Sequence, residues 1–336
     1  MRVPALRMLE ELPPSTSRGL CLDQAKASLV PNTIGNFFDA EKVSLMLSQY
    51  ISCVEANLTS ELLDTSTHIQ FLSDTLNTAK DYFENYTCVS DLPTSSPIRN
   101  ETWTDKGKSY DIGILLDRPR SKIHLVSNFI SEEECRAVEE AANPILQVAV
   151  VDDGKGGSEV SKHRKAMQAG IRVNWDKEPD GDLVARLSRR VYDYANHVLG
   201  LNLRENGQED LMSIQYFGRG ANDTEPDRYF PHCDGACGGL PHKEGARIAT
   251  MVLYCTIPLK GGATNFRKAG IHVEPKKFFG TFFSYIGPED GIMDDGFTEH
   301  SGCPVVDGEK KIVTQWIRLG VDDDHPHSKS RVSPIV

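Results

Sequence analysis

The sequence lacks a long apolar run: nowhere in its 336 residues is there a stretch of about eighteen apolar residues, the length that a membrane-spanning helix requires. It also lacks excess positive charge, since 37 Lys and Arg residues against 48 Asp and Glu residues give a formal net charge of -11. Such a balance disfavours a nucleic-acid groove or a site for an anionic membrane surface. Residues 1–20 contain no continuous apolar core, so no signal peptide is evident.

Cysteines and glycosylation signals, by contrast, are present in number. The eight cysteines permit disulfides without demanding them, and Cys233 and Cys237 are as compatible with a disulfide as with two free thiols. The Asn-x-Ser/Thr acceptor pattern occurs four times, at Asn57, Asn85, Asn100 and Asn222. These features suggest a glycoprotein of the secretory pathway but do not require one.

The residues best suited to chemistry are His232, Asp234 and His300. If residues 229–234 run extended, alternate side chains share a face, so His232 and Asp234 point the same way and Cys233 points opposite. Sheet pairing can bring His300 alongside, because strand-like residues flank it. Two imidazoles and one carboxylate leave positions open for dioxygen and a chelating co-substrate, which suits ferrous iron. We therefore predict an iron site at these three residues.

An alternative hypothesis, a zinc site, uses some of the same residues. His232, Cys233, Cys237 and His242 form a Cys and His cluster of the kind that holds structural zinc. It is disfavoured because His232 would have to leave the iron site and because the spacings are not those of a zinc finger.

Short β-branched and apolar segments surround the predicted ligands. Three of them, 247–256, 278–285 and 311–318, are separated by Gly and Pro turns, and 261–266 turns back into a strand. This pattern predicts a sandwich or jelly roll. Lys310 begins one of these strands, and its ammonium on a long stem suits one end of a small dicarboxylate inside such a fold.

Helical patterns lie mainly outside these strands. Ser131 and Glu134 form a capping box, which predicts a helix to about residue 142, and 182–199 has helical apolar spacing. We expect both helices to cover the outside of the strands. In the N-terminal region two amphipathic helices are expected at 39–55 and 68–86, packed within the chain or against a partner subunit.

The chain is thus predicted to have four parts. Residues 1–90 form an N-terminal helical region, 91–120 a polar, Pro-interrupted linker, 121–321 the catalytic domain and 322–336 a polar tail. At 336 residues the chain is long enough for a catalytic domain of about 200 residues with a buried core.

The motifs together resemble the prolyl 4-hydroxylase catalytic domain, which belongs to the iron(II)- and 2-oxoglutarate-dependent dioxygenases. The matching patterns are His-x-Asp, Arg-x-x-Thr, Gly-Gly-x-Thr-x-Phe, Gly-Thr-x-x-x-Tyr, His-x-x-Cys-Pro-Val, a lysine ten positions after that histidine and a closing Trp. The resemblance covers roughly 121–321. It implies a mainly β double-stranded β-helix, or jelly roll, with flanking helices, preceded by a small helical region.

The resemblance also implies roles for individual residues. Iron would be held by His232, Asp234 and His300, and the distal carboxylate of 2-oxoglutarate by Lys310. Further co-substrate contacts would come from Tyr216 and Thr250, although Tyr216 also fits a half-buried strand aromatic. The groove for a proline-rich or collagen-like peptide would be lined by Tyr229 and Trp316, unless these are core residues.

The expected activity is hydroxylation of peptidyl proline to 4-hydroxyproline with Fe(2+), O2 and 2-oxoglutarate, releasing succinate and CO2, with L-ascorbate rescuing oxidised iron. The resemblance implies the endoplasmic reticulum lumen, and we expect the start of the chain to be truncated or misannotated, since residues 1–20 carry no signal peptide. Two alternatives remain: an oxygenase for another peptide or small molecule, and a non-catalytic peptide-binding module. The complete set of ligands and Lys310 speaks against the second.

Overall fold

The computed structural model describes residues 21, 49, 52–53, 88, 93–152, 158–160 and 164–327. The chain divides into two compact units, Met1–Thr87 with Asp152–Glu159, and Cys88–Val151 with Val160–Val336. In the first unit the described residues Gln49, Ser52 and Cys53 are helical, within the predicted helix 39–55. The rest of that helix, the helix 68–86 and the end of the tail, 328–336, lie outside the described residues.

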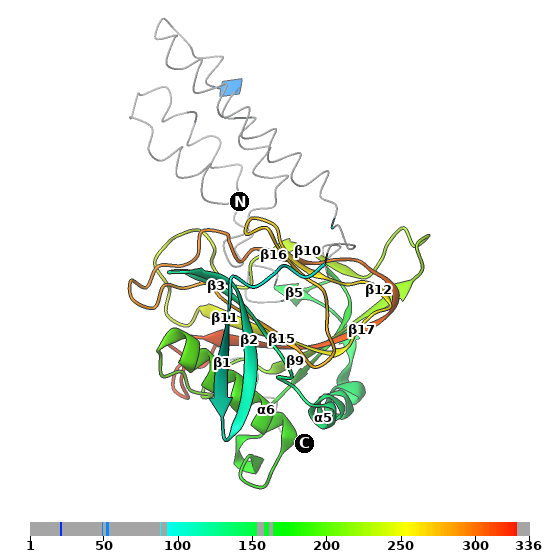
Figure 1. Cartoon of the computed structure of the whole chain (residues 1–336). Helices are drawn as coiled ribbons and strands as arrows, with labels where there is room; N and C mark the ends of the chain where they lie inside the picture. Colours follow the sequence, from blue (N-terminus) through cyan, green and yellow to red (C-terminus); the bar gives the residue numbers. More distant parts are fainter. Residues whose placement is uncertain are drawn as a thin grey trace, which may run out of the picture. The chain divides into compact units, whose positions relative to one another are not determined.

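The second unit contains two antiparallel sheets (Figure 1). The larger follows the order β1 (Arg99–Asp105), β2 (Lys108–Arg118), β3 (Ser121–Val126), β15 (Gly280–Ser284), β11 (Arg247–Thr256), β17 (Val305–Arg318), β9 (Leu211–Arg219), β8 (Met167–Ile171) and β4 (Gln147–Val148), with β12 (Lys260–Gly261) also paired to β17. The smaller follows the order β14 (Ile271–Val273), β13 (Thr264–Phe266), β16 (His300–Gly302), β10 (Arg228–His232) and β7 (Arg164–Lys165). A separate two-stranded ladder joins β5 (Val151–Asp152) and β6 (Ser158–Glu159).

Side chains of the two sheets meet in a common core. The rings of Phe266, in the smaller sheet, and Phe283, in the larger, have centroids 5.2 Å apart. The Tyr254 hydroxyl lies 3.1 Å from that of Thr264 and 3.0 Å from that of Thr281. Burying one such aromatic side chain stabilises the fold by about 1.5–3 kcal/mol. The mainly β jelly roll predicted from the strand pattern is confirmed.

Two helices pack beside the larger sheet, α5 (Glu132–Ala142) and α6 (Leu183–Leu199) (Figure 1). The capping box at the start of α5 is present as predicted, with Ser131 Oγ accepting from the Glu134 amide. The Asp182 carboxylate caps α6, which ends at Gly200 in the left-handed conformation. A short 3-10 turn, η1 (Asn143–Ile145), follows α5, and another, η2 (Trp175–Lys177), precedes α6. No helix in the described part of the chain is long and apolar enough to cross a membrane.

The structure corrects the predicted linker at 91–120. From Arg99 to Arg118 this segment is a β-hairpin, β1 and β2, at the edge of the larger sheet. Its turn has Lys106 at φ 47° and Gly107 at φ 84°, the two positive values that a tight hairpin turn of matching twist needs. Trp103 and Tyr110 pair across the hairpin and are buried, with ring centroids 5.3 Å apart.

Every cysteine of the chain is in a disulfide. The pairs are Cys21–Cys53, Cys88–Cys303, Cys135–Cys255 and Cys233–Cys237. We expect thiol titration of the unfolded, unreduced protein to detect no free thiol, and the same assay after reduction to detect all eight cysteines. A stoichiometric thiol before reduction would contradict this pairing, and peptide mapping after alkylation would show which pair is open.

Candidate metal centre and adjoining pocket

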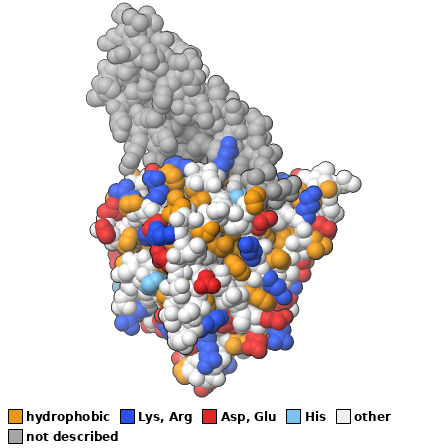
Figure 2. All heavy atoms as spheres, in the orientation of Figure 1, with side chains coloured by type: hydrophobic (Ala, Val, Ile, Leu, Met, Phe, Trp, Pro, Cys, Tyr) orange, Lys and Arg blue, Asp and Glu red, His pale blue; other side chains and the backbone are white. Residues whose placement is uncertain are grey.

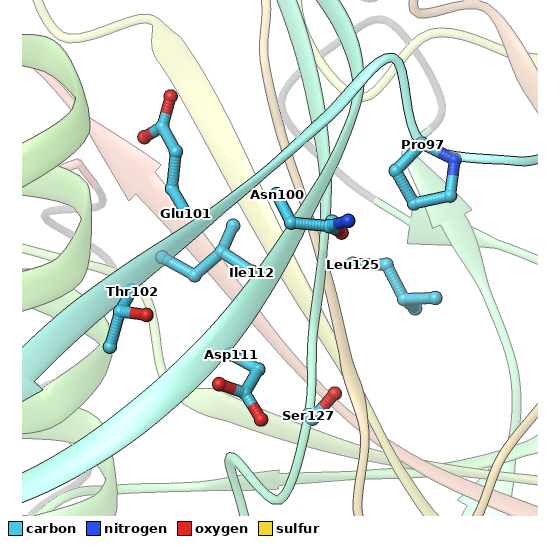
Figure 3. A pocket seen from close by; sticks show the side chains of 9 residues that line it. Pro97, Asn100, Glu101, Thr102, Asp111, Ile112, Leu125 and Ser127 are labelled. Atoms are coloured by element: carbon cyan, nitrogen blue, oxygen red, sulfur yellow. The ribbon is translucent and has the colours of Figure 1, made fainter.

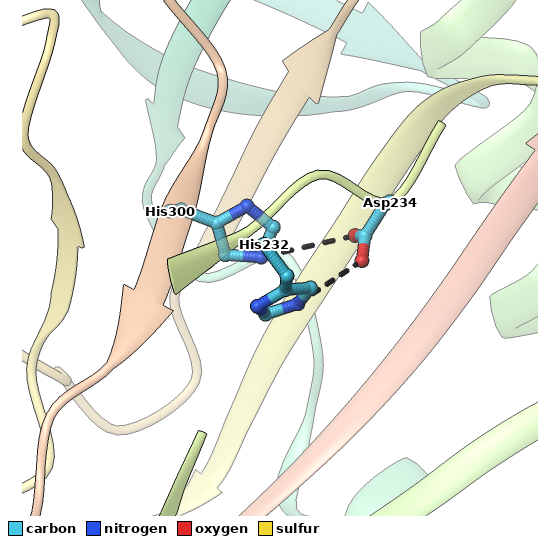
Figure 4. A group of neighbouring side chains, drawn as sticks. All are labelled: His232, Asp234 and His300. Atoms are coloured by element: carbon cyan, nitrogen blue, oxygen red, sulfur yellow. Dashed lines mark ion pairs between the residues drawn. The ribbon is translucent and has the colours of Figure 1, made fainter. Parts of the chain in front are cut away.

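The three predicted metal ligands lie together at one end of the smaller sheet (Figure 4). His232 ends β10, His300 begins β16, and the two residues stand directly opposite each other in the ladder. The Nε2 atom of His232 is 3.4 Å from Asp234 Oδ1, and that of His300 is 3.9 Å from Asp234 Oδ2. The candidate ligand atoms all lie within 4.8 Å of one another, close enough to share one ion.

Asp234 lies beyond the end of β10 and not within a continuous strand 229–234, as the sequence predicts. Cys233 is nevertheless buried between the two ligands. The next residue, Gly235, is confined: a Cβ there would come within 2.3 Å of the Tyr285 ring and 2.7 Å of the Arg247 carbonyl oxygen. Glycine therefore lets the chain pass close to β11 as it leaves the ligands.

Each of the two imidazoles has its Nδ1 atom against a backbone carbonyl, which leaves its Nε2 atom for a cation. His232 Nδ1 lies 2.8 Å from the Phe230 carbonyl oxygen, and His300 Nδ1 lies 3.1 Å from that of Thr298. Because a carbonyl can only accept, each Nδ1 carries the proton and each Nε2 presents a lone pair. Burial, followed by the charge of His232, lowers the pKa of His300 to about 4, which keeps that ring neutral.

The carboxylate of Asp234 is held ionised and oriented. Burial opposes its ionisation, but the two imidazoles and Arg247 outweigh burial and keep the pKa of Asp234 below its ordinary value. Thr250 Oγ1 donates to Asp234 Oδ2 at 2.8 Å, and the Tyr285 hydroxyl lies 3.1 Å from Thr250 Oγ1. Two imidazoles and one carboxylate on one face fit a divalent transition metal with open positions.

Further residues that support this carboxylate were assigned no role from the sequence. Arg247 donates to the Asp234 backbone carbonyl at 3.3 Å, and Glu209 holds the Arg247 guanidinium by two hydrogen bonds of 2.5 Å. Arg247 and Tyr285 fall inside the Arg-x-x-Thr and Gly-Thr-x-x-x-Tyr patterns, the only signal by which the sequence could have suggested them.

Thr250→Val is expected to weaken binding of Mn(2+) by roughly tenfold, because it removes the hydroxyl that orients Asp234 and leaves the carboxylate short of a donor. Thr250→Ser, which keeps the hydroxyl, is the matched control and should bind Mn(2+) nearly as the native chain does. Calorimetric titration measures both. If Thr250→Val changes only 2-oxoglutarate affinity, the hydroxyl serves the co-substrate rather than Asp234.

Lys310 is buried, and no acid among the described residues lies beside it. It lies inside β17, opposite Tyr216 on β9, and not at the start of a strand as the sequence predicts, because pairing with β12 extends β17 back to Val305. The side chain is 3% exposed, and Nζ is 5.5 Å from the Tyr216 ring centre and 5.8 Å from that of Tyr254. Burial lowers the pKa of Lys310 to about 7, and no carboxylate counters this effect. A buried ammonium of this kind fits an anionic ligand.

Of the two aromatic residues predicted to line a substrate groove, Tyr229 contacts a candidate ligand and Trp316 contacts Arg247. The Tyr229 ring stacks on that of His232 with centroids 3.5 Å apart. The Arg247 guanidinium lies 4.0 Å from the Trp316 ring centre. Trp316 is buried, and its Nε1 has no hydrogen-bond partner among the described residues.

The alternative zinc cluster does not form. Cys233 and Cys237 are joined in a disulfide, and His242 Nε2 lies 3.2 Å from the Ala246 carbonyl oxygen. Within the described ranges, the only group of metal-binding side chains is His232, Asp234 and His300.

One hollow in the described part of the chain is lined by none of the predicted site residues. This hollow, on the hairpin side of the larger sheet, is lined by Pro97, Asn100, Glu101, Thr102, Asp111, Ile112, Gly113, Leu125 and Ser127 (Figure 3). On the face drawn in Figure 2, basic and acidic side chains are interspersed. This face shows no basic stripe of the kind that tracks a nucleic acid.

The fold and the site together define a class: a jelly roll with two histidines and one aspartate at a metal-binding position and a buried lysine on β17. Comparison with known proteins specifies the relatives. Prolyl 4-hydroxylase subunit alpha-1 of Gallus gallus is 31% identical over 206 residues, covering 60% of this chain and 36% of that protein. Prolyl 4-hydroxylase 2 of Arabidopsis thaliana is 29% identical over 224 residues, covering 60% and 68%.

No family model matches the chain. A solved structure of a viral collagen prolyl hydroxylase from Paramecium Bursaria Chlorella virus-1, in a 2OG complex, is 23% identical, with a TM-score of 0.44, covering 59% of this chain and 95% of that one. The chain spans about a third of the length of the first curated relatives that it matches. These relatives confirm the predicted resemblance to the prolyl 4-hydroxylase catalytic domain.

Proposed function

We propose that this chain hydroxylates peptidyl proline to 4-hydroxyproline, using Fe(2+), O2 and 2-oxoglutarate and releasing succinate and CO2. The observation that carries the proposal is the pairing of a two-histidine, one-aspartate cluster with Lys310, a buried cation that has no acid of its own. The similarity to prolyl 4-hydroxylases supports the choice of proline.

Each group has a separate task in this proposal. His232, Asp234 and His300 hold the metal, and ferrous iron, when bound, would supply the activation of dioxygen. Lys310 binds the distal carboxylate of 2-oxoglutarate, with Tyr216 packed on the lysine and excluding water. Since Thr250 Oγ1 donates to Asp234, it orients the metal-binding carboxylate.

Tyr229 and Trp316 are proposed to hold the substrate peptide. Aromatic faces suit a proline-rich segment in the polyproline II form. L-ascorbate is proposed as the reductant that returns oxidised iron to the ferrous state. The endoplasmic reticulum lumen is the proposed compartment, supported by the pairing of all cysteines, since disulfides persist in oxidising surroundings.

The deciding experiment measures succinate release from the iron-loaded protein with and without proline-rich and collagen-like peptides, and the peptide mass after reaction. A gain of one oxygen on proline supports the proposal. If succinate release depends on another substrate, that compound and not peptidyl proline is the substrate of the enzyme. Peptide binding with no succinate and no mass change would indicate a non-catalytic binding module on the same fold.

Co-substrate affinity is expected to fall as the pH rises above about 7, the pKa of Lys310 in the free protein. Only the ammonium form pairs with the carboxylate, so above this pH binding must take up a proton, and affinity should approach a tenfold loss per pH unit. Calorimetry in buffers of different ionisation enthalpy measures the proton uptake. Lys310→Arg stays charged and should lose this pH dependence. The same dependence in that variant would assign it to another group.

A further inference from the structure

One disulfide is built into the metal-binding segment itself. Cys233 stands between the ligands His232 and Asp234 and is bonded to Cys237, with the two Cα atoms 6.2 Å apart. Cys233 is 8% exposed. Its sulfur is therefore buried beside the metal ligands, and the bond closes residues 233–237, with Asp234 among them, into a short loop.

The loop that begins at this disulfide docks onto the segment leading to the third ligand. The Gly239 amide donates to the Asp294 carbonyl oxygen at 2.9 Å, and the Met293 amide donates to the Leu240 carbonyl oxygen at 2.8 Å. Pro241 and Ile292 form an isolated antiparallel bridge at the same place. Residues 237–241 and 291–294 thus form one hydrogen-bonded unit.

From that unit the contacts continue to His300. The Asp294 carboxylate is fully buried and accepts from the Phe297 amide at 3.1 Å, the Thr298 amide at 2.8 Å and the Thr298 hydroxyl at 2.7 Å. Ser121 Oγ on β3 also donates to Asp294. The turn fixed in this way presents the Thr298 carbonyl oxygen to His300 Nδ1.

We propose that the Cys233–Cys237 disulfide positions the metal ligands relative to one another, holding His232 and Asp234 directly and His300 through the docked loop and the Asp294 turn. Metal affinity should then depend on whether this bond is closed. The proposal rests on the proposed function, because it assumes that His232, Asp234 and His300 bind a metal. It adds the disulfide as a positioning element that does not itself bind the metal. Reduction by a phosphine cleaves the S–S bond, gives two thiols with protons from water, and leaves the phosphine oxide.

The test is calorimetric titration of the full chain with Mn(2+) alone, before and after phosphine treatment. We expect Cys233→Ser with Cys237→Ser to bind Mn(2+) about 10–100-fold more weakly than the oxidised native chain, the range found when groups supporting metal ligands are removed. Phosphine should weaken the native chain similarly and leave this double variant unchanged. The matched control is Cys135→Ser with Cys255→Ser, which removes the disulfide between α5 and β11 and should keep native affinity.

Equal Mn(2+) affinity of the oxidised native chain and the Cys233 and Cys237 double variant would overturn the positioning role and leave the proposed function standing. A native chain that binds no divalent metal would overturn both. If the double variant does not fold, partial reduction of the Cys135 and Cys255 variant, with alkylation and peptide mapping, decides the matter. Affinity must then fall in step with opening of the Cys233–Cys237 bond, and an unchanged affinity with this bond open refutes the role.

Discussion

His232→Ala is expected to lower peptide-dependent succinate release by about a thousandfold or more, at least about 4 kcal/mol in barrier height, because it leaves two of three ligands for the metal. The fold should survive, since His232 lies at the end of β10 and is partly exposed. Succinate release and Mn(2+) titration measure the two losses, and thermal unfolding monitors the fold.

A histidine ten positions further on, His242, provides a matched control for this variant. His242 belongs to the docked loop and bonds only to the Ala246 carbonyl oxygen among the hydrogen bonds of its ring, so His242→Ala should retain succinate release within a few-fold. Comparable loss in both variants would mean that the loop, and not the ligand, controls turnover. Retained turnover in His232→Ala would remove the basis of the proposed function.

Lys310→Met is expected to weaken 2-oxoglutarate binding about 100-fold or more while making the free protein more stable. Truncating one partner of a buried charge pair costs about 2–5 kcal/mol of binding. In the free protein, however, the Lys310 ammonium has no acid partner, and its lowered pKa of about 7 records the cost of burying it. Methionine has a similar shape and carries no charge, so this cost disappears.

The sign of the stability effect follows from proton binding. Between pH 7 and the ordinary lysine pKa of about 10.4, the unfolded chain binds a proton at Lys310 that the folded chain has lost, so native stability rises with pH in this window. Lys310→Met should therefore stabilise most at pH 7 and below, on the order of a few kcal/mol, and least above the window. Chemical unfolding at several pH values measures this.

The neighbouring lysine controls for a general charge effect. Lys311 points to the other side of β17, where its ammonium pairs with Glu139 and with Glu309 at 3.5 Å. Lys311→Met should leave 2-oxoglutarate affinity nearly unchanged and should not stabilise the protein. A destabilised Lys310→Met variant with native 2-oxoglutarate affinity would contradict the assignment of Lys310 to the co-substrate.

Local patterns were enough to predict much of this fold. Strand β11 (Arg247–Thr256) has the predicted bounds, and α5 begins at the capping box of Ser131 and Glu134, because these signals depend on nearest neighbours along the chain. The predicted linker 91–120 is wrong, because most of this segment is the hairpin β1–β2. Its exposed face is polar, as in many antiparallel edges, and this hid the buried Trp103 and Tyr110.

The site could be predicted only as far as single segments determine it. His232 and Asp234 sit two residues apart, so their shared direction follows from local geometry. The contact of Thr250 with Asp234, and the stacking of Arg247 on Trp316, depend on how β11 and β17 meet the residues after β10. Such long-range register is not encoded in any local pattern, and neither is the pairing of eight cysteines.

The direct opposition of His232 and His300 in the β10–β16 ladder bears on redesign of the protein. Because paired backbone holds the two imidazoles, a redesigned chain keeps its metal site only while β10 and β16 keep their register. A one-residue slip of β16 would instead turn His300 to the opposite face. Successful grafts should therefore preserve strand alignment even where they alter loop length.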